Sequence, residues 1–338
     1  MKSNSEKDKQ LLLKKAKTAM ARQMSASTAT QAGLFSDVFF KRVPIAELKH
    51  DSPDNMAAMV NDQLEFLKHR KKDHLSIRVF NPDKERNGWD CQHTVVELSN
   101  DDMPFLVDTA SMVMQELELG VHLIVHPVLN VQRDESGQLK SFHRRSTKAS
   151  IKESFIHIHL DKQTNPKVLA SIATHLESRL AMIRTTVADW QPMKESLERA
   201  ISEFGENAPD LPEKVRKECV NFLEWVDDDH FMFIGARSYD IVQKGNVASL
   251  KVVDGTGLGL LREDGKTVLS RPIASASDES RFNPNAPLIV TKANSLSPMH
   301  RSGYMDYIGV LRFDKNGIII GEHRFLGLFT SRAYQERV

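Results

Sequence analysis

The sequence predicts an α+β protein with two sheets, each accompanied by helices. Three observations support this prediction. Short segments of alternating apolar and polar residues indicate strands, and longer segments with apolar residues three and four positions apart indicate helices. A proline- and glycine-containing segment at residues 205–214 divides the chain. The part before it mixes helices with strands, and the part after it consists mostly of strands.

The composition is ordinary for a globular protein and excludes several classes. The 338 residues are 40% hydrophobic and 27% charged, with a formal net charge of +1. This balance does not suggest a nucleic-acid partner. No apolar run approaches the roughly 20 residues that span a bilayer, so no membrane partner is expected. Two cysteines, Cys91 and Cys219, form no disulfide framework, which suits the reducing cytoplasm.

The first segment, residues 1–33, is predicted to hold a lysine-rich helix over 4–23 and a small, polar linker over 24–33. The next, residues 34–204, is predicted to be an α/β domain with flanking helices. A short helix is expected at Leu34–Lys41. A second helix is expected to start after Ser52, which suits an N-cap, and to run to about Lys68.

The rest of the 34–204 segment alternates strands and helices. Strands are predicted at Leu75–Phe80, Thr94–Leu98, Val121–Arg133, Leu139–Phe142 and Phe155–Leu160. Helices are predicted between Asn100 and Gly120, from Pro166 onward, and over 181–204 with a bend at Pro192. This order is most of a ferredoxin-like βαββαβ unit with helices on one sheet face. Its last strand is missing, and the strand at 75–80 is expected to take the vacant position.

The second part divides into a linker and helix, 205–230, and a β domain, 231–338. The β domain is predicted to be an antiparallel meander of five to seven strands. Its turn signals are Gly245-Asn246, Asp264-Gly265 and Asn316-Gly317. Such a sheet is closer to a PAS- or GAF-type sensor domain than to a doubly wound fold.

No motif predicts catalysis or cofactor binding. The glycines in Asp254-Gly255-Thr-Gly257-Leu-Gly259 have the spacing G-x-G-x-G, and strand and turn residues follow them. A dinucleotide fingerprint needs G-x-G-x-x-G before a helix. These glycines therefore predict a β-bend. We expect no catalytic residue and no cofactor site in these residues.

Four histidines are candidates for a metal site or a pH switch. His122 and His126 are two strand positions of equal parity, and so are His157 and His159, which places each pair on one face. If the two strands pair, four imidazoles approach one another. The alternative is a sheet face that is open to solvent or to another domain, because the opposite face supplies the apolar residues.

The segment Asn100-Asp-Asp-Met-Pro104 is a candidate effector site. A helix that begins here would offer free N–H groups and a positive field, so Asn100, Asp101, Asp102 and Met103 are the candidate effector-binding residues. The alternative is simple capping, since Asp101 and Asp102 would repel a carboxylate ligand.

Several long runs resemble one known family, the large bacterial NAD-specific glutamate dehydrogenases. The first domain resembles their first ACT-type domain in Asn100-Asp-Asp-Met-Pro-Phe-Leu-Val-Asp108, His122-Leu-Ile-Val-His-Pro127 and His157-Ile-His159. The helical region resembles theirs in Val187-Ala-Asp-Trp-Gln-Pro-Met193 and Glu224-Trp-Val-Asp-Asp-Asp-His-Phe231. The late strands match in Leu288-Ile-Val-Thr-Lys-Ala-Asn294, Tyr304-Met-Asp-Tyr-Ile-Gly-Val310 and Arg324-Phe-Leu-Gly-Leu-Phe-Thr330. The resemblance covers residues 30–338.

The resemblance implies an ACT-like domain followed by a PAS-type domain, as a non-catalytic N-terminal piece of a cytoplasmic enzyme. The parent would oxidise L-glutamate to 2-oxoglutarate and ammonia with NAD. Its partners would be the downstream catalytic domain of the same polypeptide, further copies in a homo-oligomer and an amino-acid effector. Two alternatives are a stand-alone amino-acid-binding regulator and a scaffold without ligand.

Overall fold

The computed structural model describes residues 4–49, 51–208, 211–244, 247–262 and 283–335. The chain forms two compact units, Met1–Leu180 and Ala181–Val338. The first unit holds helices α1 (Asn4–Gln23), α2 (Ala26–Phe39), α3 (Ile45–Leu48), α4 (Pro53–Leu67), α5 (Lys84–Asn87), α6 (Leu106–Glu116) and most of α7 (Pro166–Ala188). Its strands are β1 (Ser76–Phe80), β2 (Thr94–Asp101), β3 (Val121–Val125), β4 (Val128–Arg133), β5 (Leu139–His143) and β6 (Ile151–Leu160).

The sheet of the first unit is antiparallel and has the order β1-β2-β6-β4-β5, with β3 also paired to β6. Strand β6 therefore lies in the middle, between β2 and the β3–β4 segment, as a ferredoxin-like unit requires. Strand β1 pairs with β2 from Ser76↔Ser99 to Phe80↔Val95. This confirms that the strand at 75–80 fills the position of the missing last strand.

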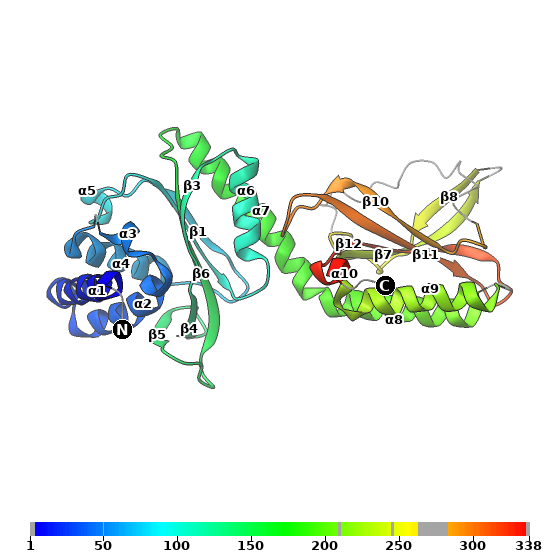
Figure 1. The fold of residues 1–338 in the computed structure, drawn as a ribbon, viewed down its shortest axis with the longest axis horizontal. Helices are drawn as coiled ribbons and strands as arrows, with labels where there is room; N and C mark the ends of the chain where they lie inside the picture. Colours follow the sequence, from blue (N-terminus) through cyan, green and yellow to red (C-terminus); the bar gives the residue numbers. More distant parts are fainter. Residues whose placement is uncertain (1–3, 50, 209–210, 245–246, 263–282, 336–338) are drawn as a thin grey trace. The chain divides into compact units, whose positions relative to one another are not determined.

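Helices cover both faces of this sheet (Figure 1). Helices α1 to α4 lie on one side and α6 and α7 on the other. The expectation of helices on one face only was therefore wrong. The N-terminal helices pack on the sheet through Phe35, Phe39 and Phe155, all at most 3% exposed. Because residues far apart in the sequence form this layer, local patterns did not predict it.

The N-terminal elements differ from the expectation in one place. Most of the predicted linker 24–33 is helical, because α2 begins at Ala26. The Ser25 hydroxyl accepts a hydrogen bond from the Thr28 amide and caps the helix. Ala32 is fully buried. The predicted cap of α4 is confirmed, since the Ser52 hydroxyl accepts from the Asn55 amide at 3.0 Å.

Two predicted elements are divided. The strand expected at Val121–Arg133 is two strands, because Pro127 lies at the junction and offers no N–H to a neighbouring strand. The long helix breaks at Asp189 rather than at Pro192. Pro192 falls in the first turn of α8 (Trp190–Asn207), where the absent N–H removes no helical hydrogen bond.

The second unit is a six-stranded antiparallel sheet with helices α8 and α9 (Glu213–Trp225) along one face (Figure 1). Its strands are β7 (Phe231–Lys244), β8 (Val247–Val252), β9 (Leu258–Gly259), β10 (Leu288–Leu296), β11 (Tyr304–Phe313) and β12 (Ile319–Phe329), followed by the short helix α10 (Ser331–Gln335). A tight turn, Val226–His230, joins α9 to β7. The strand order is β10-β11-β12-β7-β8, and β9 pairs with β7. The predicted antiparallel sheet is confirmed, but its strands do not follow one another as a simple meander, because the first strand, β7, pairs with the last, β12.

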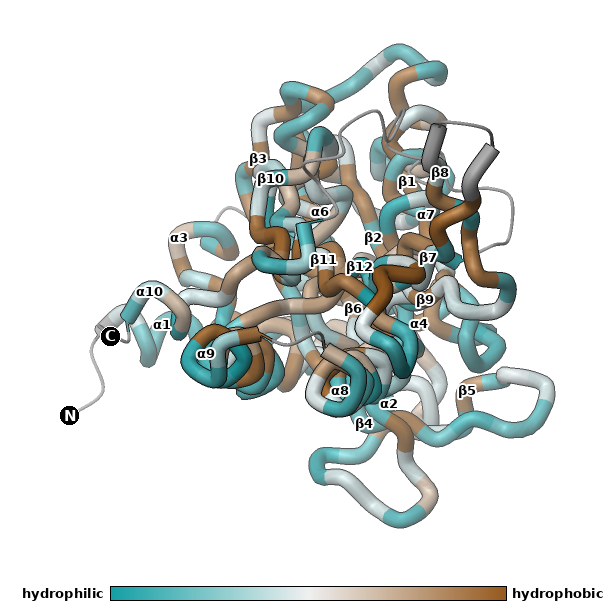
Figure 2. The backbone as a smooth tube through the Cα atoms, turned by 90° about the vertical axis from the view of Figure 1, so that its right-hand side faces the viewer, coloured by the Kyte–Doolittle hydropathy of each residue, from teal (hydrophilic) through white to brown (hydrophobic). Residues whose placement is uncertain are grey.

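Helices α8 and α9 carry both hydrophobic and hydrophilic residues (Figure 2). Met193, Leu197 and Ala200 of α8 pack with Phe233 and Phe325 of the sheet in one buried cluster. Since α8 buries its apolar face here, it belongs to the second unit, whereas the sequence placed 181–204 in the first. The compact units meet at Leu180, not at the 205–214 segment.

The turns of the second sheet follow the sequence signals that the structure describes. Gly317 has φ 74° in the β11–β12 hairpin, as the Asn-Gly signal predicts. The predicted turns at Gly245-Asn246 and Asp264-Gly265 lie outside the described residues. The glycine triplet is a bend, as predicted. A Cβ on Gly259, at φ 57°, would lie 2.2 Å from the Ile234 carbonyl oxygen. Among the described residues, no helix is both long and apolar enough to cross a membrane.

Candidate functional site

The central strand β6 places two histidines on the sheet face that the N-terminal helices cover. His157 lies opposite Glu97 of β2, and His159 lies opposite Leu123 of β3. The His157 Nδ1 atom is 2.8 Å from Glu97 Oε1, and His157 Nε2 is 2.8 Å from His159 Nε2. The buried carboxylate and the two imidazoles thus form one hydrogen-bonded chain.

Two more imidazoles, those of His93 and His122, extend this series of side chains to the surface. The ring centroid of His93 lies 5.3 Å from that of His159 and 4.4 Å from that of His122. His122 Nε2 is 2.7 Å from the Asp161 carboxylate. The side chain of His157 is 1% exposed and that of His122 is 45% exposed. We call His157, His159, His93 and His122 the histidine row, which leads from a buried carboxylate to solvent.

Glu97 is fully buried and is held by further polar groups. Arg78 donates from Nε to Glu97 Oε2 at 2.7 Å, and Gln63 Nε2 donates to Oε1 at 3.2 Å. Burial alone would raise the pKa of Glu97, but His157 and Arg78 outweigh it and hold the pKa below its ordinary value. Arg78 also binds Asp62, which accepts from the indole of Trp89 at 3.0 Å. The inner end of the row is therefore anionic and fixed.

The middle of the row is electrically neutral near pH 7. Burial, reinforced by the neighbouring imidazoles, lowers the pKa of His159 to about 2. Burial and the adjacent His122 also lower the pKa of His93. Neutral imidazoles donate from one nitrogen and accept at the other, so the row suits hydrogen bonding or proton relay.

A wide polar pocket of about 1160 Å³ opens beside the row, with His93 and His159 among its lining residues. Loop residues before α4 and around α5 form the remaining wall. Carboxylates outnumber lysines there: the lining includes Lys84 and Lys162 and five acidic residues, Glu47, Asp51, Asp83, Glu85 and Asp90. A small ligand in this pocket would meet neutral imidazole groups at the sheet and negative charge at the rim.

The four predicted histidines are only partly brought together. His122, His157 and His159 share the row. His126 lies apart, at the β3–β4 junction, where its Nε2 is 2.9 Å from the Ser154 hydroxyl. Among the described residues, no group of three His, Cys, Asp or Glu side chains is arranged to hold a metal ion.

The expected open sheet face is instead covered. The ring of Phe39 in α2 meets His157 edge-on at 5.5 Å between centroids, and Gln63 of α4 approaches its Nδ1 at 3.2 Å. His93 was missed because it precedes the first strand residue, Thr94. The register Thr94↔Leu160 extends to His93 and Asp161, so antiparallel pairing of β2 with β6 was the signal that could have located it.

The other predicted site residues do not cap a helix. Asn100 and Asp101 belong to β2, and α6 begins only at Leu106, after Phe105 at φ 69°. Asp101 accepts from Arg70 at 2.7 Å, and Asp102 accepts from the Ser154 hydroxyl at 2.7 Å. The helix began later than expected because strand pairing with β6 continues to Asp101.

Asn100 is 3% exposed and Met103 is half-buried. The side chains of Asn100, Asp101 and Asp102 thus interact with their own unit. Effector binding by Asn100, Asp101, Asp102 and Met103 stays a prediction.

A buried ionic cluster lies at the same end of the sheet. Glu153, fully buried in β6, accepts from Arg70 at 2.8 Å and from Arg133 at 2.6 Å. Burial alone would raise the pKa of Glu153, but the two guanidinium groups hold it below its usual value. This cluster fixes α4 and β4 to the central strand, and we interpret it as structural.

The α/β order, the sheet order with β6 in the middle and the helix-covered faces fit an ACT-like α/β unit, which is followed in the sequence by a second, antiparallel β unit. Residues 35–176 match the family model described as "Glutamate dehydrogenase, ACT1 domain". This confirms the family that the sequence motifs resemble: the chain is a relative of the NAD-specific glutamate dehydrogenases.

Curated relatives support the same family over nearly the whole chain. The NAD-specific glutamate dehydrogenase of Halomonas elongata is 30% identical over 330 residues, which is 96% of this chain and 20% of the relative. That of Pseudomonas aeruginosa is 29% identical over 325 residues, 95% of this chain and 20% of the relative. That of Mycobacterium tuberculosis is 24% identical over 82% of this chain and 16% of the relative. The chain spans about a fifth of the length of the first two relatives.

Proposed function

We propose that this chain is the N-terminal regulatory and assembly segment of a large, cytoplasmic NAD-specific glutamate dehydrogenase. The parent would convert L-glutamate and NAD to 2-oxoglutarate, ammonia and NADH in a downstream catalytic domain. The observation that carries the proposal is the similarity to enzymes of this name over 96% of this chain but only 20% of the relative. The partners would be that domain, further copies in a homo-oligomer and an amino-acid effector.

The second unit supports a sensor role in this proposal. Its first long strand, β7, pairs with its last, β12, in the middle of the sheet, and two helices lie on one face. This arrangement favours a PAS- or GAF-like sheet. Asp189 supports its glycine bend, accepting from the Gly259 amide at 2.7 Å and from Arg262 Nε at 2.6 Å. The bend is thus a fixed part of the sheet rather than a nucleotide loop.

A direct assay tests the non-catalytic part of the proposal. The purified chain is incubated with L-glutamate and NAD, and NADH formation is followed by absorbance. We expect no glutamate-dependent NADH. Turnover by the chain alone, retained through repeated purification, would refute the proposal.

Ligand screening separates a regulator from a scaffold. Thermal unfolding of the chain is measured with a panel of amino acids and nucleotides. A ligand at 100 times its dissociation constant adds about 2.7 kcal/mol to the free energy of unfolding. A clear shift with one amino acid supports the regulatory role. The absence of a shift across the panel would favour a scaffold, the alternative without a ligand.

A further inference from the structure

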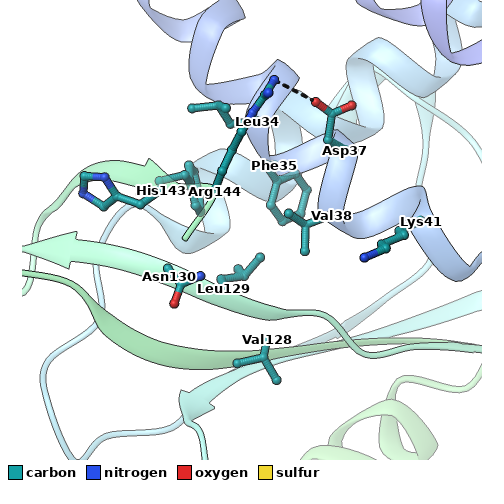
Figure 3. A pocket seen from close by; sticks show the side chains of 11 residues that line it. Leu34, Phe35, Asp37, Val38, Lys41, Val128, Leu129, Asn130, His143 and Arg144 are labelled. Carbon is teal, nitrogen blue, oxygen red and sulfur yellow. Dashed lines mark hydrogen bonds and ion pairs between the residues drawn. The ribbon is translucent and has the colours of Figure 1, made fainter. Parts of the chain in front are cut away.

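A second, smaller pocket lies on the first unit, away from the histidine row. It measures about 480 Å³ and lies between α2 and the strands β4 and β5 (Figure 3). Neither the family resemblance nor the proposed function assigns a role to it. We call it the α2–β4 pocket. Its volume is within the range of small-molecule sites, about 300–1,000 Å³.

The floor of the α2–β4 pocket is apolar and rigid. Phe35, Leu129 and Phe142 are 1%, 2% and 6% exposed, and the rings of Phe35 and Phe142 lie 5.7 Å apart. Leu34 and Val38 of α2 add to the wall because residues four apart share a helix face. The three buried side chains back the pocket, and the apolar surface that a ligand could cover comes from the half-buried Leu34 and Val38 and from Val128, which is 38% exposed.

The rim of the pocket is positively charged. Arg144 extends across the pocket toward Asp37, and Lys41 lies in the short 3-10 turn Phe40–Arg42 that follows α2 (Figure 3). Asp37 is engaged twice, by Lys17 and by Arg144 at 3.5 Å. In the part of the chain that the structure describes, the Lys41 ammonium takes part in no ion pair. Asp37 is thus neutralised by two cations, and Lys41 adds a further positive charge to the rim.

We infer that the α2–β4 pocket binds a small monocarboxylate that carries a compact apolar group. The apolar group would cover Leu34, Val38 and Val128, and the carboxylate would meet Arg144 and Lys41 at the rim. This inference does not rest on the proposed function, whose substrate and product are dicarboxylates.

The chemistry fits two sources, apolar amino acids and apolar acids without an amino group. They differ in the ammonium group, which Asp37 would accept. The binding assay therefore uses 3-phenylpropionate and hexanoate as one arm and L-phenylalanine as the other. The controls are 3-phenylpropanamide, which lacks the carboxylate, and acetate, which lacks the apolar group. Binding to the full chain is measured by calorimetry.

Variants locate the binding. The exposed Arg144→Ala change should weaken 3-phenylpropionate binding about tenfold, because it removes a cationic partner of the ligand carboxylate. Lys41→Ala should also weaken it. Arg145→Ala is the matched control, because Arg145 is exposed and adjacent but does not line the pocket. It should leave the affinity unchanged.

A pocket-filling variant, Val38→Trp, should abolish binding without removing charge. Circular dichroism establishes whether it folds, and Arg144→Ala carries the test if it does not. The inference is overturned if the amide binds as tightly as the acid, if Arg144→Ala and Arg145→Ala bind alike, or if neither acid binds at millimolar concentration. Because neither NADH formation nor the wider amino-acid panel is measured here, failure of this inference does not refute the proposed function.

Discussion

The Nε2 atoms of His157 and His159 lie 2.8 Å apart on the central strand of the first unit. A single hydrogen must lie between them, so one imidazole donates and the other accepts. Because burial and the neighbouring imidazoles lower the pKa of His159 to about 2, its ring is neutral near pH 7. Protonation of His159 is therefore unfavourable in the folded chain.

His159 should make the first unit acid-sensitive. Its pKa is about 2 in the folded chain and about 6.5 in the unfolded chain, so between these values only the unfolded state binds the proton. The free energy of unfolding should fall as the pH drops below about 6.5, by at most about 1.4 kcal/mol per pH unit. His159→Gln should reduce this slope in urea titrations over a pH series. The exposed helical His175→Gln is the control, and an equal loss of slope in both would contradict the explanation.

Removing one cation from the buried ionic cluster should be costly. Arg70→Met leaves Glu153 fully buried with Arg133 as its remaining guanidinium. We expect a loss of about 3–5 kcal/mol in the free energy of unfolding. Lys68→Ala, which removes an exposed pair with Glu65, should cost at most about 1 kcal/mol. Similar losses in the two variants by urea denaturation would show that Glu153 finds another partner.

Two glycines should respond to alanine in opposite directions. Gly259 has φ 57° and no room for a Cβ, so Gly259→Ala should destabilise the second unit by more than about 1 kcal/mol. Gly205 lies within α8 with nothing within 4 Å of an added Cβ. Gly205→Ala should stabilise by up to about 1 kcal/mol. The melting temperatures of the two variants test this prediction. A higher melting temperature for Gly259→Ala would contradict the tight backbone conformation at Gly259.

The boundary at Leu180 predicts which unit each core residue supports. Leu197 of α8 is fully buried in the second unit, and Leu176 of α7 is fully buried in the first. Each change to alanine should cost about 2–5 kcal/mol. Hydrogen exchange should show faster opening of β12 in Leu197→Ala and of β6 in Leu176→Ala. Faster opening of β6 in Leu197→Ala would instead indicate that α8 stabilises the first unit.

Local patterns predicted most strands and helices because each depends on neighbouring residues. Asn316-Gly317 marked its hairpin, and Ser52 marked the start of α4. Residues 24–33 were misread since alanine, serine and threonine suit a linker as well as a helix, and burial of Ala32 against distant residues decides between them.

The candidate site was only half predictable. Strand parity placed His157 and His159 on one face, and antiparallel pairing joined them to His122. His93 lay just outside a predicted strand. The cover from Phe39 and Gln63 depends on contacts across about 100 residues of sequence. Neither the depth of the row nor the pocket beside it follows from periodicity.

Strand β1 fills the place that the final strand of a ferredoxin-like unit normally occupies. That strand would ordinarily draw the chain back to the sheet edge after α7. Because β1 already forms the edge of the sheet, the chain does not return to the sheet after α7. The helix continues to Ala188, past the end of the first unit at Leu180. With the edge strand supplied by an earlier segment of the sequence, a single helix can connect the first unit to the second.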